Sequence, residues 1–106
     1  MFDANGKRKG PGKCTWIDGS TYDGEWLNDV RHGKGVFKSR EGTVYDGEFV
    51  DDIREGPGVL TYISGNKIKG TWEKDRLQGP GELINKGKSP IKAVFHNDIA
   101  VVGQVG

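Results

Sequence analysis

Residues 22–26, Tyr22-Asp23-Gly24-Glu25-Trp26, carry the pattern of a β-strand with one apolar face. The two rings and the glycine between them alternate with two carboxylates, and a strand places alternate residues on opposite faces. A helix of this length would hold a glycine in its middle, which costs about 1 kcal/mol relative to alanine. The segment is therefore predicted to be a strand with ring, glycine and ring on one face and carboxylates on the other.

This pattern belongs to a repeat of 23 residues. Four Gly-x-Gly pairs follow one another at that spacing, at Gly10/Gly12, Gly33/Gly35, Gly56/Gly58 and Gly79/Gly81. Three columns of the opening strand keep the same phase, at Tyr22, Tyr45, Ile68 and Ile91, at Gly24, Gly47, Gly70 and Ala93, and at Trp26, Phe49, Trp72 and Phe95. A fixed short period indicates an array of stacked units that bury their apolar faces against their neighbours.

Each unit is predicted to be a β-hairpin followed by a turn. Residues 35–38 and their equivalents 58–62 are rich in β-forming residues, and turn residues follow them at 41–42 and 64–65. Because strands lie about 4.8 Å apart, two strands per unit predict a rise of roughly 10 Å per repeat. The expected fold class is all-β, an elongated single-layer antiparallel ribbon of successive hairpins.

The glycines of this lattice are expected to be structural. Those with this role are Gly24, Gly33, Gly35, Gly47, Gly56, Gly58, Gly70, Gly79 and Gly81. A glycine on a strand face lets a neighbouring ring or backbone come close. We therefore expect aromatic rings to cover Gly24, Gly47 and Gly70.

Composition limits the classes of protein that this chain can form. In 106 residues, 18 glycines and a hydrophobic share of 33% leave too little apolar material for a thick core. A net charge of +1 with mixed signs argues against a dedicated nucleic-acid binder. The single cysteine, Cys14, cannot form an internal disulfide, and the longest apolar run, 99–102, is too short to span a bilayer. We expect a soluble protein of the cytoplasm.

The sequence resembles a known repeat. Residues 22–26, 31–35 and 41–43, followed by a second copy of the opening motif at 45–49, resemble the MORN repeat, the membrane occupation and recognition nexus motif. The resemblance covers nearly the whole chain. It implies an elongated antiparallel ribbon of hairpins with a groove-like aromatic face.

The expected units are unequal in quality. Residues 22–44 and 45–67 match the motif closely, and 68–90 match with an isoleucine in place of the tyrosine. Residues 1–21 form a partial first repeat, and 91–106 form a degraded repeat or a C-terminal cap. Unequal ends fit either terminal caps, which repeat arrays need for solubility, or a piece of a longer array, and the opening in mid-unit favours the second.

For function, the resemblance implies a non-catalytic module. Arrays of this kind look like scaffolds or adaptors that bind protein segments in cytoskeletal, ciliary or membrane-adjacent assemblies. Phospholipid binding has also been ascribed to them, and some adjoin kinase or methyltransferase domains. Two alternatives therefore stand beside the scaffold, a peripheral phosphoinositide-binding module and the accessory region of a longer enzyme.

Residues suited to catalysis are scarce. Two histidines, His32 and His96, with one cysteine leave little material for nucleophilic or metal chemistry, and no phosphate-loop motif follows the Gly-x-Gly pairs. An aspartate column recurs at the start of each tight turn, at Asp29, Asp52, Asp75 and Asp98. Turn chemistry explains such a column better than acid-base catalysis. We expect no enzyme activity, no cofactor and no metal.

The aromatic column is the candidate partner-binding site. Its expected residues are Tyr22, Trp26, Phe37, Tyr45, Phe49, Leu60, Tyr62, Trp72 and Phe95. These rings can equally be the core, but a single sheet normally needs a second layer to cover its apolar face. We expect part of the ring surface to stay open and to form a groove for an amphipathic helix or an extended peptide.

A basic column carries the lipid alternative. It comprises Arg8, Arg31 and Arg54, broken by Leu77, with nearby lysines at Lys7, Lys9, Lys34 and Lys38. Such cations could touch anionic headgroups, whereas a solvated row of turn residues is the simpler interpretation. The open strand edges near 13–16 and 99–102 also predict a possible homodimer.

Overall fold

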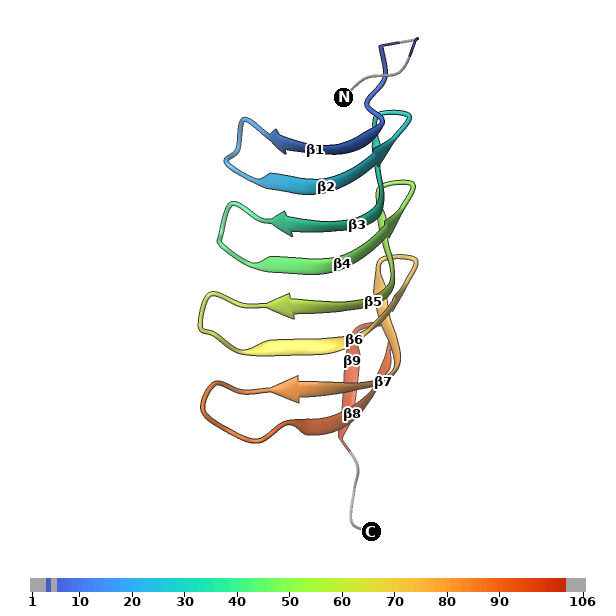
Figure 1. The fold of residues 1–106 in the computed structure, drawn as a ribbon. Coiled ribbons are helices and arrows are strands. Elements are labelled where there is room, and N and C mark those ends of the chain that lie inside the picture. The colour runs from blue at the N-terminus through green and yellow to red at the C-terminus, as the bar shows by residue number, and fades with distance from the viewer. Residues whose placement is uncertain (1–3, 5, 103–106) are drawn as a thin grey trace.

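The computed structural model describes residue 4 and residues 6–102, which form nine strands in one antiparallel sheet. The strands are β1 (Gly10–Thr15), β2 (Thr21–Leu27), β3 (Val30–Lys38), β4 (Val44–Val50), β5 (Ile53–Thr61), β6 (Lys67–Glu73), β7 (Arg76–Ile84), β8 (Ile91–His96) and β9 (Ile99–Val102). Each strand pairs with the next along the chain (Figure 1), over principal extents of 59 × 24 × 18 Å. The prediction of a single-layer ribbon of hairpins is confirmed.

Two kinds of connection alternate along the ribbon. The short ones are two-residue turns with both φ angles positive, at Asn28-Asp29, Asp51-Asp52, Lys74-Asp75 and Asn97-Asp98. Two successive left-handed residues define the type I′ hairpin turn, whose twist matches that of the flanking strands. The prediction that the aspartate column stands in tight turns is confirmed.

The long connections close each repeat and lie at the ends of the strands opposite the two-residue turns. In the first three, a glycine N–H donates to the carbonyl three residues earlier, as Gly19 does to Trp16 at 3.0 Å. These glycines have φ angles near +95° to +99°. In the fourth connection Gly87, with φ +77°, takes this conformation one position early. Gly87 stands one position earlier in its repeat than the other three glycines, and the fourth connection therefore forms a different turn.

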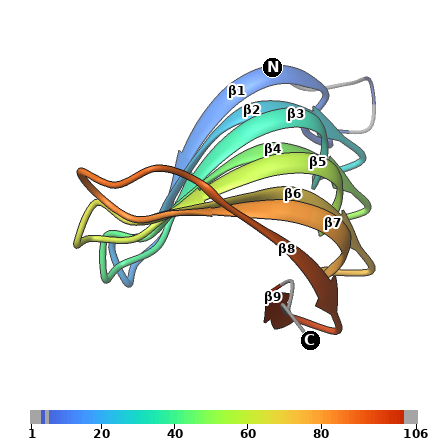
Figure 2. The same cartoon turned by 90° about the horizontal axis from the view of Figure 1, so that it is seen from below.

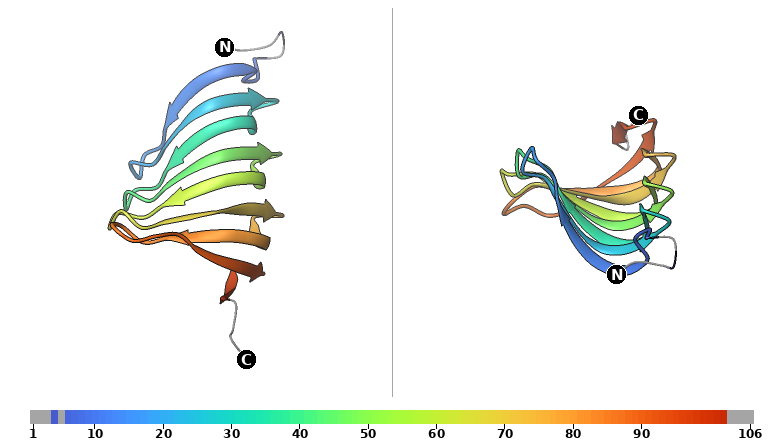
Figure 3. Two further views of the ribbon diagram at one scale, coloured as in Figure 1. Left: turned by 60° about the horizontal axis from the view of Figure 1, so that its bottom comes forward. Right: turned by 90° about the horizontal axis from the view of Figure 1, so that it is seen from above.

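Bulges bend the strands around one face of the sheet. The register shifts between Gly24 and Trp26, and the two later hairpins repeat the shift. Bulges bend the strand that carries them and increase its twist. Figures 2 and 3 show the resulting curvature, which all the long strands share. The face inside this bend, here called the inner face, carries the rings, and the outer face carries the alternating charged residues.

The core is a single file of side chains on the inner face. Its buried members are Tyr22, Trp26, Tyr45, Phe49, Trp72, Leu77, Ala93 and Phe95. Five of the rings form a continuous ladder in which neighbours meet edge to face, with centroids 4.9 to 5.3 Å apart. Edge-to-face pairs contribute about 0.5–1.5 kcal/mol each beyond their burial. The ladder therefore joins one repeat to the next.

The glycines on the inner face make room for this ladder. A Cβ on Gly24 or Gly47 would collide with the hydroxyl of the tyrosine two residues earlier, so the expected ring cover is confirmed there. At Gly70 the nearest side chain is Leu77, 3.0 Å from such a Cβ, and the Phe95 ring is 3.9 Å away. The aromatic cover expected at Gly70 is thus mostly aliphatic, because Ile68 replaces the tyrosine of the earlier repeats.

Candidate interaction groove

The inner face holds a groove between successive repeats. A cavity of about 370 Å³ lies over β3, β4 and β5, and its lining residues are Arg31, Phe37, Ser39, Thr43, Tyr45, Phe49, Asp52, Arg54, Leu60 and Asp75. A second hollow continues it toward the first repeat, past Trp16 and Phe37. The floor is apolar, one wall is made of arginine and aspartate pairs, and the long connections make the other.

The arginine wall is built by contacts between repeats. Arg31 donates from Nε to Asp52 Oδ1 at 2.8 Å and from Nη2 to the Asp52 carbonyl at 2.9 Å. Arg54 makes the same two contacts with Asp75 one repeat later, at 2.5 and 2.9 Å. Arg8 lies 3.5 Å from Asp29 in the first repeat. Each guanidinium is therefore fixed by the turn of the following repeat.

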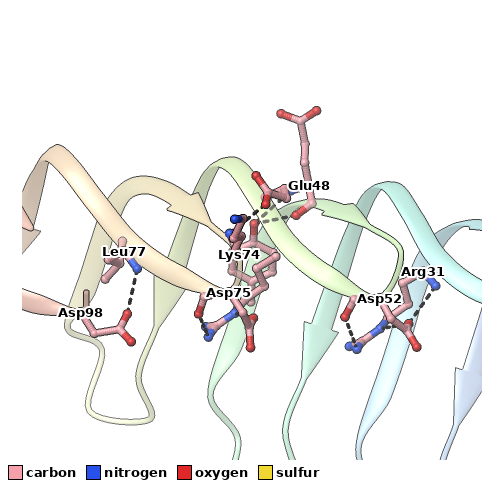
Figure 4. A network of polar contacts seen from close by, with 10 residues as sticks. Arg31, Glu48, Asp52, Lys74, Asp75, Leu77 and Asp98 are labelled. Carbon is pink, nitrogen blue, oxygen red and sulfur yellow. Dashed lines mark hydrogen bonds and ion pairs between the residues drawn. The ribbon is translucent and has the colours of Figure 1, made fainter. Parts of the chain in front are cut away.

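The backbone of the arginine also bonds to the aspartate, and each residue donates one hydrogen bond and accepts one. The N–H of Asp52 donates to the carbonyl of Arg31, while the Asp52 carboxylate accepts from the Arg31 N–H at 2.9 Å. Asp98 repeats this exchange with Leu77, where its carboxylate accepts the Leu77 N–H at 2.8 Å (Figure 4). The aspartate column thus links repeats beyond the ends of the paired strands.

The arginines also cover the rings. The guanidinium carbon of Arg31 lies 4.7 Å from the centroid of Phe49 and 5.2 Å from that of Phe37, and Arg54 lies over Tyr45 in the same way. Cation–π contacts of this kind contribute about 0.5–1 kcal/mol at exposed sites and more when desolvated. The expected solvated basic row is wrong for Arg31 and Arg54, because both lie over the aromatic core.

Burial and pairing shift the ionisation of two groups in the groove. Burial opposes ionisation of Asp52, but hydrogen bonds from Arg31 and its charge outweigh burial and hold the Asp52 pKa below its usual value. Burial raises the pKa of Tyr45 to about 12. At neutral pH Asp52 is therefore ionised, and the Tyr45 hydroxyl stays protonated.

A second set of contacts between repeats was missed from sequence. His32, Glu55 and Gln78 stand at equivalent positions of three successive repeats. Each of them contacts a residue 19 positions on: the Asp51 N–H donates to His32 at 3.4 Å, the Lys74 N–H to Glu55 at 2.8 Å, and Gln78 donates to Asn97. Complementary polar residues at a spacing of 19 were the signal available in the sequence.

The predicted partner-binding rings are mostly out of reach. Tyr22, Trp26, Tyr45, Phe49, Trp72 and Phe95 are all buried, with at most 6% of their surface exposed. The bent sheet and the arginines cover these six rings without a second layer, so the part of the predicted column that stays open is at Phe37 and Tyr62. Phe37 and Leu60 are half-buried at the groove floor, and Tyr62 is 41% exposed.

The structure does not bring the predicted lipid-binding cations together. Arg31 faces inward, whereas Lys34 and Lys38 alternate with Gly33, Gly35 and Phe37 and so face outward from the same strand. Lys7 and Lys9 are exposed at the start of the chain, and Arg8 faces Trp26 and Asp29. These residues are split between two faces, so they form no common headgroup site.

The described residues offer no metal centre and no membrane helix. Within residue 4 and 6–102, no three residues among His, Cys, Asp and Glu are placed to hold a metal ion. In that same part of the chain, no helix is long and apolar enough to cross a bilayer.

Comparison with known proteins identifies the repeat. A family model described as the MORN repeat matches residues 4–21, 22–44, 45–67 and 69–86, which is more than half of the chain. No curated protein matches the sequence.

Proposed function

The chain belongs to the MORN-repeat family, and from that membership we propose a scaffold or adaptor module that binds a protein segment in its inner groove. Repeats of this family are generally non-catalytic. The observation that carries the proposal is the groove itself, which keeps an apolar floor at Phe37 and Leu60 although the rings beneath are sealed. Concave apolar surfaces with a few convergent polar groups are typical of binding sites.

The buried rings support this function indirectly. They set the bend of the sheet and the positions of the arginines, while Phe37, Leu60 and Tyr62 supply the contact surface for a partner. The paired arginines and aspartates at the wall favour specificity, since charged groups at the edge of an interface select partners more than they add affinity. We place the module in a cytoplasmic assembly, of the cytoskeletal, ciliary or membrane-adjacent kind.

A peptide-display selection against the intact chain tests the proposal. Peptides that it selects should shift the backbone amides of Phe37 and Leu60 in NMR titrations and leave outer-face residues such as Asp46 and Lys69 unchanged. An outer-face variant, Lys69→Glu, serves as the matched control and should retain affinity within about twofold. Selected peptides that shift only the outer face would contradict the groove assignment.

A lipid-binding function has one observation in its favour, at a different place from the arginine column. Ile17 is fully exposed and Ile63 is 79% exposed, both at the tips of long connections on the same edge of the ribbon. Apolar side chains at a surface edge can enter the boundary of a bilayer. Cosedimentation with phosphatidylserine vesicles that Ile17→Ser with Ile63→Ser abolishes would support this candidate, whereas no sedimentation at low salt would exclude it.

A further inference from the structure

A row of side chains with one residue per repeat runs along the inner face, and two of its members, Phe37 and Leu60, line the cavity of the groove. The row comprises Cys14, Phe37, Leu60 and Leu83, all half-buried against the core. Each pairs across the sheet with a residue of the column Tyr22, Tyr45, Ile68 and Ile91, as Phe37 does with Tyr45 and Leu83 with Ile91, so the row follows the long axis of the ribbon. Two strands separate successive members, which sets their spacing at roughly 9.6 Å.

This spacing discriminates between partner conformations. A polyproline II helix returns to the same face every three residues, or roughly 9.3 Å. An α-helix returns every seven residues, or roughly 10.5 Å, and falls about 2.7 Å out of step over the three intervals of the row. An extended strand repeats its face at roughly 6.8 and 13.6 Å and misses the row altogether. The polyproline II helix stays within about 1 Å over all four positions.

Two aromatic residues stand at the same position of the long connections, two repeats apart. The Trp16 ring lies 6.0 Å from Phe37 and is 37% exposed, and Tyr62 occupies the same turn position two repeats later with 41% exposed. Two repeats span roughly 19 Å, which equals about six residues of polyproline II. Exposed aromatic walls that flank a groove are the usual surface for this conformation.

Charge along the same wall gives the groove a direction. The first connection, 16–20, carries only Asp18, and the second, 39–43, carries one charge of each sign. The third, 62–66, carries none, and the fourth, 85–90, carries Lys86 and Lys88. Lys86 and Lys88 are both exposed, so a partner with acidic residues beside the fourth connection is complementary to that end of the ribbon.

We propose that the occupant is a proline-rich segment in the polyproline II conformation, with an apolar side chain at every third residue and acidic residues at the end beside Lys86 and Lys88. This inference rests on the proposed groove function and specifies the class of partner. Because such a segment is already extended in solution, it loses little conformational entropy on binding.

Three synthetic peptides test the proposal by calorimetry and amide shifts with the intact chain. The first has four Pro-Pro-Leu triplets with two glutamates at one end, made in both orientations. The second has the same composition with leucine at every fourth position, which scatters the leucines around the helix. The third is an α-helical peptide with leucine at every seventh position. The first should bind at least about tenfold more tightly than the others in one of its orientations.

Variants on the long connections localise the binding. Trp16→Ala and Tyr62→Ala should each weaken the triplet peptide by about fivefold or more, because each removes an aromatic wall. Ile63→Ala, on the exposed residue next to Tyr62, and Val36→Ala, on the outer face next to Phe37, are matched controls and should stay within about twofold. Lys86→Glu with Lys88→Glu should weaken the triplet peptide in its preferred orientation.

The outcomes separate this inference from the broader function. Tighter binding of the heptad peptide in the same groove would overturn the polyproline assignment and leave the groove function standing. Equal binding of the first and second peptides would overturn the assignment as well. If no peptide, synthetic or display-selected, shifts groove amides, both the assignment and the groove function fail.

Discussion

The repeats at 22–67 and the repeat that begins at Ile68 solve the same packing problem in different ways. In the earlier repeats a tyrosine lies over two glycines, its hydroxyl binds a backbone carbonyl, and an arginine covers the ring. In the later one, Ile68 replaces the tyrosine and Leu77 replaces the arginine, and in the unit after it Ile91 replaces the tyrosine and Ala93 replaces a glycine. The core of the earlier repeats is therefore built from tyrosine rings and arginines, whereas aliphatic side chains fill the same positions in the later part of the chain.

These replacements depend on one another. Ile91 stands two residues before Ala93, where the earlier repeats have a tyrosine, so a methyl group fits at Ala93, which is only 4% exposed. Leu77 is also 4% exposed and fills the space near Gly70 that the ring would have taken. Because the core is one side chain deep, a change in one repeat is compensated by its immediate neighbours. The comparison therefore predicts different responses to mutation in the two regions.

The largest expected effect is at the glycines. Gly35→Ala should destabilise the protein by about 2–4 kcal/mol, because its Cβ would overlap the Tyr22 ring, which is fully buried and cannot move aside. Gly70→Ala should cost less than about 1 kcal/mol, since it meets only the end of the Leu77 side chain. Urea unfolding of both variants measures the difference, and equal losses would contradict the proposed distinction.

Removal of a tyrosine hydroxyl comes next. In Tyr45→Phe, two backbone groups of Glu48 lose a partner, the carbonyl at 2.9 Å and the N–H at 3.1 Å. Tyr22→Phe removes one such bond, to the Glu25 carbonyl. We expect losses of about 1–3 kcal/mol for the first and about half of that for the second. A larger loss in Tyr22→Phe than in Tyr45→Phe would contradict the expectation that the loss follows the number of hydroxyl hydrogen bonds.

Replacement of the arginine wall should cost less. Arg54→Leu imitates Leu77 and should change stability by less than about 1 kcal/mol, because the leucine keeps the ring covered while a partly exposed ion pair is lost. Arg54→Ala, which uncovers the ring, is the informative comparison and should cost more. Thermal unfolding at low and high salt checks both, and a salt-dependent loss in Arg54→Leu as large as that in Arg54→Ala would refute the covering role.

The remaining effects concern pH and are confined to alkaline and acid solution. Since burial raises the folded-state pKa of Tyr45 to about 12, its contribution to stability is complete below the unfolded pKa near 10 and decreases as the pH rises toward 12, by about 2 kcal/mol. Asp52 acts in the opposite direction. Its folded-state pKa is lowered, so its contribution is present above the unfolded value and disappears as the pH falls through the folded one.

Urea unfolding across these two pH windows provides the measurement. Tyr45→Phe should remove its own part of the alkaline loss and leave that of Tyr22, whose pKa burial also raises, and Asp52→Asn should reduce the acid loss. The repeat that begins at Ile68 has no tyrosine in the column, so the same measurements on Ile68→Val should show unchanged pH dependence.

Much of this molecule could be predicted from its periodicity. Strand positions, hairpin connectivity and the single layer follow from a 23-residue spacing in which Gly24, Gly47 and Gly70 alternate with large residues. The burial of the rings could not be predicted, because it depends on how far the bulges bend the sheet. The role of Arg31 was missed for a related reason: its distance from Phe49 across the bend, 4.7 Å, cannot be derived from their separation in sequence.

The amino-acid sequence alone determined the repeat, its strands and turns, and the face on which each side chain lies, because those follow from local alternation and backbone preference. Only the tertiary structure decided which surfaces stay open. Curvature sums small local distortions over nine strands, and it closed the aromatic ladder under the arginines while it left the row at Phe37 and Leu60 accessible.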